Sequence, residues 1–158
     1  MSASRVGLGF DVHRFGAERP LMLAGVRFEG EDGLLGHSDG DAVCHALADA
    51  LLGAAGLGDI GDRFPETDPS VEGIAGSELL GRVVDEVRAA GFEPISVDLT
   101  VIAERPRVAP VRASIREGLA TMLGIAPERV SVKATRPEGL GLSGDGIGCI
   151  ALAVLDPR

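Results

Sequence analysis

The chain has no tryptophan, no tyrosine and only two cysteines among its 158 residues. Aromatic rings that stack on bases are therefore scarce, and the formal net charge of −9 opposes contact with a phosphate backbone, so we expect no nucleic-acid partner. Cys44 and Cys149 lie in separate apolar segments. This pattern fits buried, reduced thiols better than a disulfide framework or a cysteine-rich metal site.

Long apolar runs are also missing. No run approaches the roughly 20 residues that span a bilayer, and residues 1–16 lack the charged start, apolar middle and small-residue cleavage site of a secretory signal. We therefore expect a cytoplasmic protein with no membrane partner. With 45% hydrophobic residues the chain can bury a real core, and its length predicts a single domain over residues 1–158.

Hydrophobic periodicity predicts an α+β fold. Strands are expected at residues 6–15, 21–28, 95–101, 130–135 and 150–155, and helices at 42–55, 77–90 and 110–123. The order of these elements indicates a mixed β-sheet with three helices packed on one face. The first and last strands have too few polar residues for the other face to meet water, so we expect a homo-oligomer formed by sheet-to-sheet packing.

The connections between these elements are less regular. Residues 57–76 show no clear periodicity, but Ile60 and Phe64 would be unusual in a solvated linker, so we interpret this segment as a partly mobile substrate loop. Ser77 is the expected N-cap of the second helix. Two prolines favour an extended connector at 103–110.

Two further features have ordinary structural interpretations. The arginines of the helix at 110–123 are interpreted as solvated surface. Thr135, Arg136 and Glu138 stand at the mouth of a glycine-rich loop that extends to residue 148, and spacing alone is also consistent with simple turn chemistry there.

The stretch His-Ser-Asp-Gly-Asp-Ala-Val-Cys-His at 37–45 holds two of the three histidines and leads into an apolar helix. Asp41, His45 and Asp49 recur every four residues and form one polar stripe along this helix. A buried polar stripe needs partners. Taken alone, His45 is therefore best interpreted as a core histidine that is hydrogen-bonded to Asp41 or Asp49.

Asp11 and His13 change this interpretation. Both point to the same face of the predicted first strand, so a carboxylate and an imidazole lie together there. A third ligand from His45 would give three protein ligands and an open fourth position, which is the composition of a catalytic zinc site. The Asp-x-His pair is a weak signal alone, but its combination with the 37–45 stretch favours this hypothesis.

Four motifs follow one another along nearly the whole chain and together resemble the 2-C-methyl-D-erythritol 2,4-cyclodiphosphate synthase family. They are Gly-Phe-Asp-Val-His-Arg-Phe at 9–15, His-Ser-Asp-Gly-Asp-Ala at 37–42, Gly-Asp-Ile-Gly-Asp-Arg-Phe-Pro-Glu-Thr-Asp-Pro at 58–69 and Val-Lys-Ala-Thr at 132–135. The resemblance implies a homotrimer in which the sheets form a prism around the threefold axis and active sites lie between neighbouring subunits.

The resemblance also implies the reaction. The family converts 4-diphosphocytidyl-2-C-methyl-D-erythritol 2-phosphate into the cyclic diphosphate and releases CMP, as a phosphorus–oxygen lyase of the non-mevalonate route to isoprenoids. Asp11, His13 and His45 are the implied zinc ligands. Glu138 is the implied ligand of a second divalent ion, Mg²⁺ or Mn²⁺, that bridges the substrate phosphates.

Four segments of this sequence correspond to the family's substrate site, in addition to Asp11 and His13. His37 and Ser38 would contact phosphate, and the loop holding the methylerythritol phosphate would comprise Asp59, Ile60, Gly61, Phe64, Pro65, Glu66, Thr67 and Asp68. The cytidine pocket would comprise Ala103, Glu104, Arg105, Pro106, Arg107, Val108 and Ala109. Further substrate contacts would come from Thr135, Arg136, Pro137, Glu138 and Leu142. His37, Thr135 and Arg136 are the residues expected to act in catalysis.

Two positions depart from the family pattern. Arg136 stands where a threonine credited with transition-state stabilisation is usual, and Asp145 stands where an arginine is usual. We hypothesise that Arg136 substitutes electrostatically for both, because a guanidinium can bind phosphate bidentately. This hypothesis predicts that Arg136→Ala reduces turnover far more than Arg112→Ala.

Two other functions remain open at this stage. A metal-dependent nucleotide diphosphate hydrolase could use the same residues, with water in place of the internal 2-phosphate as the nucleophile. The other is a non-catalytic trimeric module that binds isoprenoid diphosphates in an axial channel. This second function predicts that His45→Ala removes zinc without abolishing function.

Overall fold

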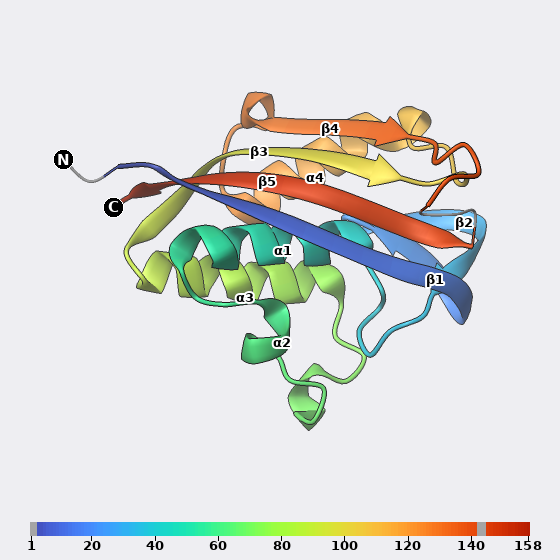
Figure 1. The fold of residues 1–158 in the computed structure, drawn as a ribbon, viewed down its shortest axis with the longest axis horizontal. Helices are drawn as coiled ribbons and strands as arrows, with labels where there is room; N and C mark the ends of the chain where they lie inside the picture. Colours follow the sequence, from blue (N-terminus) through green and yellow to red (C-terminus); the bar gives the residue numbers. More distant parts are fainter. Residues whose placement is uncertain (1–2, 142–144) are drawn as a thin grey trace.

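The computed structural model describes residues 3–141 and 145–158, which form a curled five-stranded sheet with helices on one face (Figure 1). The strands are β1 (Arg5–Leu23), β2 (Val26–Leu34), β3 (Phe92–Ile102), β4 (Val130–Thr135) and β5 (Gly146–Pro157). They are ordered β2-β1-β5-β3-β4 across the sheet. The β3–β4 pair is parallel and the other pairs are antiparallel, so the predicted mixed sheet and the opening hairpin are confirmed.

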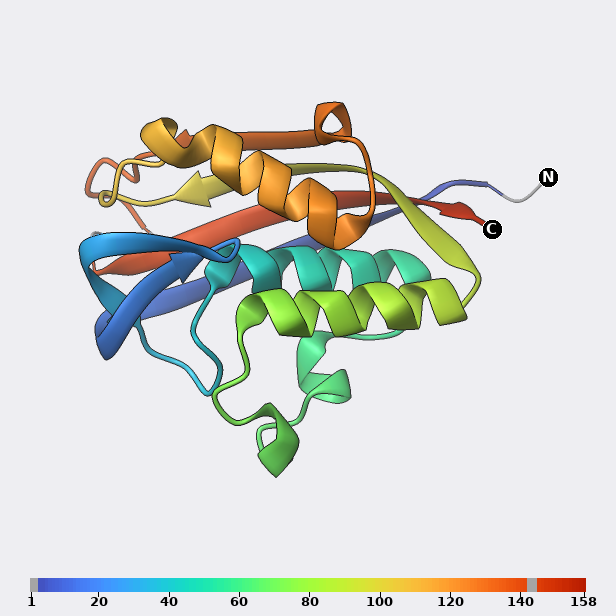
Figure 2. The same cartoon turned by 180° about the vertical axis from the view of Figure 1, so that it is seen from behind.

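Three long helices cover one side of this sheet, as predicted. They are α1 (Ala42–Ala55), α3 (Gly76–Ala89) and α4 (Arg112–Leu123), and Figure 2 shows all three in front of the strands. α1 packs on β1 and β5, and α3 packs on α1. Within the described ranges, no helix combines the length and apolar character needed to cross a membrane.

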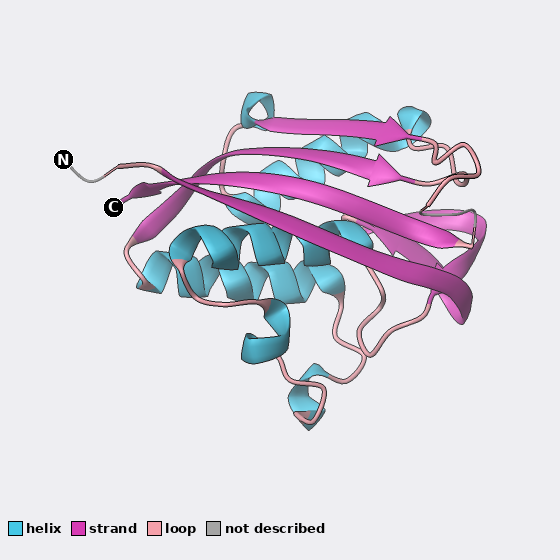
Figure 3. Cartoon of the chain, viewed as in Figure 1, coloured by secondary structure: helices cyan, strands magenta, loops and turns pink. Residues whose placement is uncertain are grey.

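The connections differ from the sequence-based expectations in three places. The segment 57–76 contains two short helices, α2 (Ile60–Arg63) and η1 (Pro69–Val71), which are visible below α3 in Figure 3. The side chain of Asp59 caps α2 by accepting a hydrogen bond from the backbone N–H of Asp62, and Asp68 does the same for η1. Such short capped turns leave no periodic apolar stripe, so hydrophobic periodicity could not predict them.

The other two differences concern α3 and the connector after β3. α3 begins one residue before Ser77, with Ala75 at the N-cap position and no capping side chain, so the predicted Ser77 cap is wrong. The connector bends between Glu104 and Pro106 instead of staying extended, and it leads into the short helix η2 (Ala109–Val111). A further short helix, η3 (Pro127–Arg129), lies between α4 and β4.

α1 is the buried centre of the fold. Twelve of its 14 residues are buried, and Gly56 ends the helix in the left-handed conformation at φ 74°. Asp41 caps the other end: its carboxylate accepts hydrogen bonds from the backbone N–H groups of Cys44 (3.0 Å), Ala24 (2.8 Å) and Gly25 (2.9 Å). Asp41 therefore ties the start of α1 to the turn between β1 and β2.

Two glycines allow α1 to lie directly on β1. A Cβ atom at Gly7 would lie 1.9 Å from the carbonyl oxygen of Ala50, and one at Gly9 would lie 1.8 Å from the carbonyl oxygen of Ala46. No side chain larger than hydrogen fits at such distances. The alternation of β1 thus places two glycines under the helix, followed on the same face by Asp11 and His13.

The opposite face of β1 is apolar and uncovered within the described part of this single chain. Val6, Leu8, Phe10 and Val12 are 47–69% exposed. The neighbouring strand β5 adds Ile150 and Leu152 to this surface, which we call the outer apolar face. Exposed apolar patches of this kind mark interaction surfaces.

Candidate functional site

The three predicted metal ligands converge where α1 crosses β1. Asp11 Oδ2 lies 2.7 Å from His13 Nε2 and 3.2 Å from His45 Nδ1, and the two imidazole nitrogens are 3.1 Å apart. Tetrahedral ligands bound to Zn²⁺ at about 2.0–2.1 Å are about 3.3 Å from one another. The triangle formed by these three atoms therefore has nearly the size that a shared metal ion requires, and this arrangement could hold a divalent ion.

Hydrogen bonds at the far side of each imidazole orient these ligands. His13 Nδ1 lies 2.7 Å from the carbonyl oxygen of Leu35, which can only accept, so Nδ1 donates and Nε2 is the atom available to a metal. His45 Nε2 lies 2.9 Å from Ser38 Oγ, and donation to this hydroxyl leaves Nδ1 available in the same way. Outer partners of this kind fix the ring orientation in metal sites.

The partners of His45 contradict the core-histidine interpretation. The Asp41 carboxylate accepts from the backbone N–H groups of Cys44 in α1 and of Ala24 and Gly25 in the β1–β2 turn. The Asp49 carboxylate accepts from the backbone N–H of Ile60 at 2.8 Å. His45 instead contacts Ser38, Asp11 and His13. The polar stripe on α1 therefore divides into a helix cap at Asp41, a candidate metal ligand at His45 and an anchor for α2 at Asp49.

Electrostatics within the triad favour an ionised Asp11. Burial raises the pKa of Asp11. The hydrogen bonds that Asp11 makes with His13 and His45, and the charges of these two histidines, outweigh the burial and lower the pKa to about 2. Burial lowers the pKa of His13, but the hydrogen bond and charge of Asp11 outweigh it, so the net shift is upward from 6.5. A metal ion would therefore compete with a proton for His13 and meet a carboxylate that is already charged.

A cavity of about 240 Å³ opens beside the triad, and we call it the metal cavity. Its wall includes His37, whose Nε2 lies 3.2 Å from Glu66 Oε2, and the buried Ser38. Its lining residues are Asp11, His13, His37, Ser38, His45, Ile60, Gly61, Phe64, Glu66, Val71, Ile74 and Leu79. Of the predicted substrate loop, Asp59, Pro65, Thr67 and Asp68 do not line this cavity, and Asp59 and Asp68 act as helix caps.

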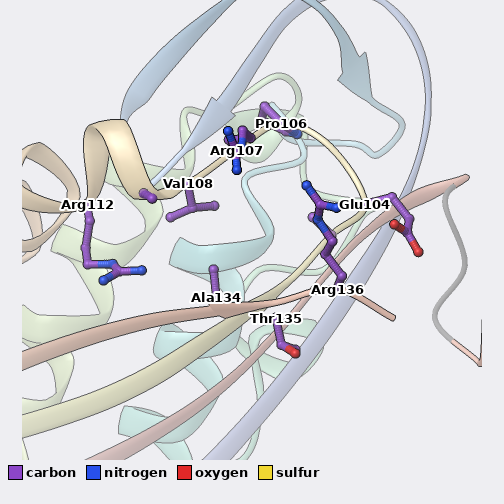
Figure 4. A pocket seen from close by; sticks show the side chains of 10 residues that line it. Glu104, Pro106, Arg107, Val108, Arg112, Ala134, Thr135 and Arg136 are labelled. Atoms are coloured by element: carbon purple, nitrogen blue, oxygen red, sulfur yellow. The ribbon is translucent and has the colours of Figure 1, made fainter. Parts of the chain in front are cut away.

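A second cavity of about 310 Å³ lies between the connector after β3 and the end of β4, and we call it the connector cavity (Figure 4). It is lined by Ala103, Glu104, Pro106, Arg107, Val108, Ala109, Arg112, Ala134, Thr135 and Arg136. Arg107, Arg112 and Arg136 have no carboxylate partner among residues 3–141 and 145–158. Three guanidinium groups around one cavity favour an anionic ligand.

Arg112 and Arg105 differ from their predicted placement. Arg112 is exposed, as predicted, but it also lines the connector cavity together with Arg136. Arg112→Ala is therefore not a neutral control for Arg136→Ala. Arg105, in contrast, does not line the cavity, and its guanidinium contacts Glu31 and Asp32 of β2.

The remaining predicted positions lie outside both cavities. Glu138 is exposed, and its backbone adopts the left-handed conformation at φ 53°. Neither Glu138 nor the preceding Pro137 lines the metal cavity or the connector cavity. Across the described ranges, Asp11, His13 and His45 form the one cluster of three metal-ligating side chains, and Glu138 is not in it. Leu142 lies outside the described residues. Asp145 lines a separate cavity with Arg14, Phe15 and Arg105, so the two departures from the family pattern line different cavities.

Three functional contributors carry no sequence signal of their own. The carbonyl oxygen of Leu35 orients His13, but any residue could supply it. Arg112, the first residue of α4, meets Thr135 and Arg136 at the connector cavity because β4 runs parallel to β3 and returns the chain to the same end of the sheet. Val71, together with Ile74 and Leu79, closes the metal cavity from the segment around η1 and α3.

Comparison with known proteins agrees with this arrangement. Residues 4–156 match the YgbB family. The 2-C-methyl-D-erythritol 2,4-cyclodiphosphate synthase of Symbiobacterium thermophilum is 48% identical over 155 residues, which cover 97% of this chain and 99% of that protein.

Solved structures of related proteins also superpose closely on this chain. The bifunctional IspDF of Campylobacter jejuni superposes with a TM-score of 0.93 at 42% identity, over 99% of this chain and 43% of that one. A 2C-methyl-D-erythritol-2,4-cyclodiphosphate synthase in a CDP-bound form has a TM-score of 0.90 at 37% identity, over 96% of this chain and the whole of that chain. The chain therefore belongs to the YgbB family, together with these cyclodiphosphate synthases.

Proposed function

We propose that residues 1–158 act as a single cyclodiphosphate synthase domain that converts 4-diphosphocytidyl-2-C-methyl-D-erythritol 2-phosphate into 2-C-methyl-D-erythritol 2,4-cyclodiphosphate and CMP. The carrying observation is the Asp11–His13–His45 triangle, whose free ligand atoms face one point beside a cavity. Membership of the YgbB family and the names of its similar members support the same reaction. In this lyase reaction the 2-phosphate oxygen bonds to the β-phosphorus, the bond between that phosphorus and the bridging oxygen breaks, and the oxygen leaves with CMP.

The donor set fits a zinc ion. Two imidazole nitrogens and one carboxylate oxygen are the ligands of catalytic rather than structural zinc sites. Zn²⁺ bound there would polarise a substrate phosphate, and we propose that a second ion, Mg²⁺ or Mn²⁺, is held by Glu138 and substrate phosphates. Ser38 and Leu35 keep the histidine ligands oriented by hydrogen bonds to the ring atoms that face away from the triangle.

The protein's own task is to bring two anions together. Phosphoryl transfer depends largely on alignment and charge neutralisation, because the protein forms no covalent bond to the substrate. His37, 64% exposed at the cavity mouth and paired with Glu66, is placed to donate to a phosphate oxygen. Ile60 and Phe64 give this cavity an apolar wall that fits the methylerythritol carbons.

The connector cavity is the proposed nucleotide site. Its wall offers backbone groups of residues 103–109 to a base, and Arg107, Arg112 and Arg136 offer positive charge to phosphates. The CDP-bound relative supports a cytidine nucleotide as the ligand class. Thr135 and Arg136, at the end of β4, are the proposed catalytic contributors on this side.

We further propose that the chain acts as a homotrimer with each active site shared by two subunits. The metal cavity and the connector cavity have no residue in common, so one chain presents two separate half-sites. The outer apolar face offers a surface through which copies could pack around a threefold axis.

Phosphorus NMR tests the reaction directly. The purified protein is incubated with the cytidine diphosphate substrate, Zn²⁺ and Mg²⁺, and the expected products are CMP and a cyclic diphosphate, with no product after chelation. CMP together with an open-chain bisphosphate would replace the proposal with a hydrolase. Zinc-loaded protein that releases no CMP would contradict a catalytic role.

A further inference from the structure

Three groups outside the connector cavity hold the side chain of Arg105. Its guanidinium donates to Glu31 (Nη1 to Oε2, 2.5 Å) and to Asp32 (Nη2 to Oδ2, 3.3 Å), and it stacks on Phe15 at 4.1 Å from the ring centre. Each of these contacts constrains a planar guanidinium in a different direction. Together they restrict Arg105 far more than a single ion pair would.

These contacts connect the wall of the connector cavity to the strands beside the metal triad. The residues on both sides of Arg105, Glu104 and Pro106, line the cavity, whereas Arg105 itself contacts β1 and β2. Phe15 follows the metal ligand His13 by two residues on β1. Arg105 is thus a direct link between the segment that forms one half-site and the strand that forms the other.

The segment around Arg105 needs such a link. Residues 104–107 belong to no helix or strand. Their position therefore depends on side-chain contacts, since no backbone ladder holds them. Glu104 supplies a weaker contact, a 3.4 Å hydrogen bond from the backbone N–H of Gly139, which itself lies in a loop.

We propose that Arg105 is a positioning residue for the nucleotide, which sets the wall of the connector cavity without touching the ligand. This inference rests on the proposed function, because it assumes that the connector cavity binds a cytidine nucleotide. It departs from the substrate-contacting role that the sequence resemblance implies for Arg105. Loss of the link should loosen residues 104–107 and weaken nucleotide binding, while the metal triad and the chemical step stay intact.

The test compares Arg105→Ala with the wild-type protein. We expect the dissociation constant for CDP, measured by calorimetry, and the KM for the substrate to rise about tenfold, with kcat and bound zinc within twofold of wild type. Hydrogen exchange of the amides of Glu104, Arg105 and Arg107 should quicken. Arg105→Lys keeps a cation but loses the planar fork, so it should recover only part of the affinity.

Arg82→Ala is the matched control. Arg82 donates to Glu78 at 2.7 Å and its side chain is 43% exposed, against 44% for Arg105, but it lies on α3 away from both cavities. It should leave CDP binding unchanged. Glu31→Gln should weaken CDP binding in the wild type and have little further effect in Arg105→Ala, since both changes break one link.

The outcomes separate this inference from the proposed function. Equal CDP affinity and KM in Arg105→Ala and wild type would overturn the positioning role even if turnover is normal. A parallel fall in kcat and zinc content would also overturn it, because it would indicate general damage to the fold. A wild type that binds CDP but releases no CMP would contradict the proposed reaction, while the variant's CDP affinity would still decide the role of Arg105.

Discussion

At the scale of single residues, the metal triad depends on atoms that would never touch the metal. Leu35 and Ser38 each engage one imidazole nitrogen and so direct the other toward Asp11. The carboxylate in turn changes how readily His13 holds a proton. Metal affinity and proton affinity at this site are therefore linked, and the direction of the linkage can be worked out from the charges.

Zinc affinity should fall as the pH falls through the pKa of His13. Burial lowers this pKa, but the hydrogen bond to Asp11 and its charge raise it by more. The net shift is therefore upward from 6.5. His13 must be neutral to bind zinc, so affinity is complete above the raised pKa and decreases by about tenfold per pH unit below it, for one displaced proton. Asp11, with a pKa near 2, stays ionised throughout.

Chelator competition between about pH 5 and pH 8 measures this affinity, and NMR titration of the His13 ring in metal-free protein measures the pKa itself. In Asp11→Asn the main cause of the upward shift is gone, so the His13 titration should move to lower pH. A His13 ring that titrates below 6.5 in the wild type would contradict the predicted direction.

Arg136 should matter far more than an arginine at the other end of the same strand. Arg136 follows β4 and lines the connector cavity, whereas Arg129 precedes β4 and lines neither cavity. A hydrogen bond to a charged group contributes about 1.5–3 kcal/mol, so Arg136→Ala should lower kcat/KM by about 10- to 100-fold. Arg129→Ala should lower it less than about twofold.

Arg112→Ala should give an intermediate loss, because Arg112 lines the same cavity from α4. Steady-state kinetics on the three variants at matched zinc content would decide the order. Equal, small effects of Arg136→Ala and Arg129→Ala would remove Arg136 from the proposed machinery.

At the scale of elements, the three candidate ligands converge because α1 packs directly on β1. Gly9→Ala would place a Cβ atom 1.8 Å from the carbonyl oxygen of Ala46, the residue after His45. The helix must shift, so we expect a loss of roughly 3 kcal/mol in the free energy of unfolding and at least tenfold weaker zinc binding. Urea unfolding with chelator present and zinc competition measure the two effects.

Gly53→Ala provides the control for this prediction. Gly53 lies on the same helix α1, and a Cβ atom there would have no neighbour within 4 Å. Alanine favours helices over glycine by about 0.5–1 kcal/mol, so this variant should be as stable as the wild type or slightly more so, with unchanged zinc binding. If Gly9→Ala bound zinc as the wild type does, close packing of α1 on β1 would not be what forms the site.

Local pattern predicted much of this arrangement. Alternation put Asp11 and His13 on one face of β1, and apolar spacing predicted α1 and helices packed on one face of the sheet. What local pattern missed depends on contacts between distant segments. The partners of Arg105 lie more than 70 residues away on β2, and Arg112 reaches the connector cavity only through the packing of α4.

At the scale of the whole molecule, the chain has two separate cavities and one large exposed apolar surface. The metal cavity lies against α1 and the segment around α2, and the connector cavity lies at the end of β3 and β4. Val6, Leu8, Phe10 and Val12 form a surface that a single chain leaves open to water. A trimer that covers this surface and joins unlike half-sites would account for both features.

Subunit complementation tests the shared site. His45→Ala destroys the metal half-site and Arg136→Glu the nucleotide half-site, so each variant alone should be nearly inactive. In co-expressed mixed trimers, a site is intact when its metal ligands come from an Arg136→Glu chain and its connector cavity from a His45→Ala chain. Random assembly makes about a quarter of the sites intact, so about a quarter of the wild-type activity should return.

The control pairs two variants of the same half-site, Asp11→Asn and His45→Ala. Every metal triangle takes its three ligands from one chain, so this mixture should recover no activity. Equal inactivity of both mixtures, with trimers present by light scattering, would show that each chain uses its own two cavities. Recovery in the first mixture alone would require the metal cavity of one subunit to face the connector cavity of the next, because neither variant chain contains an intact pair.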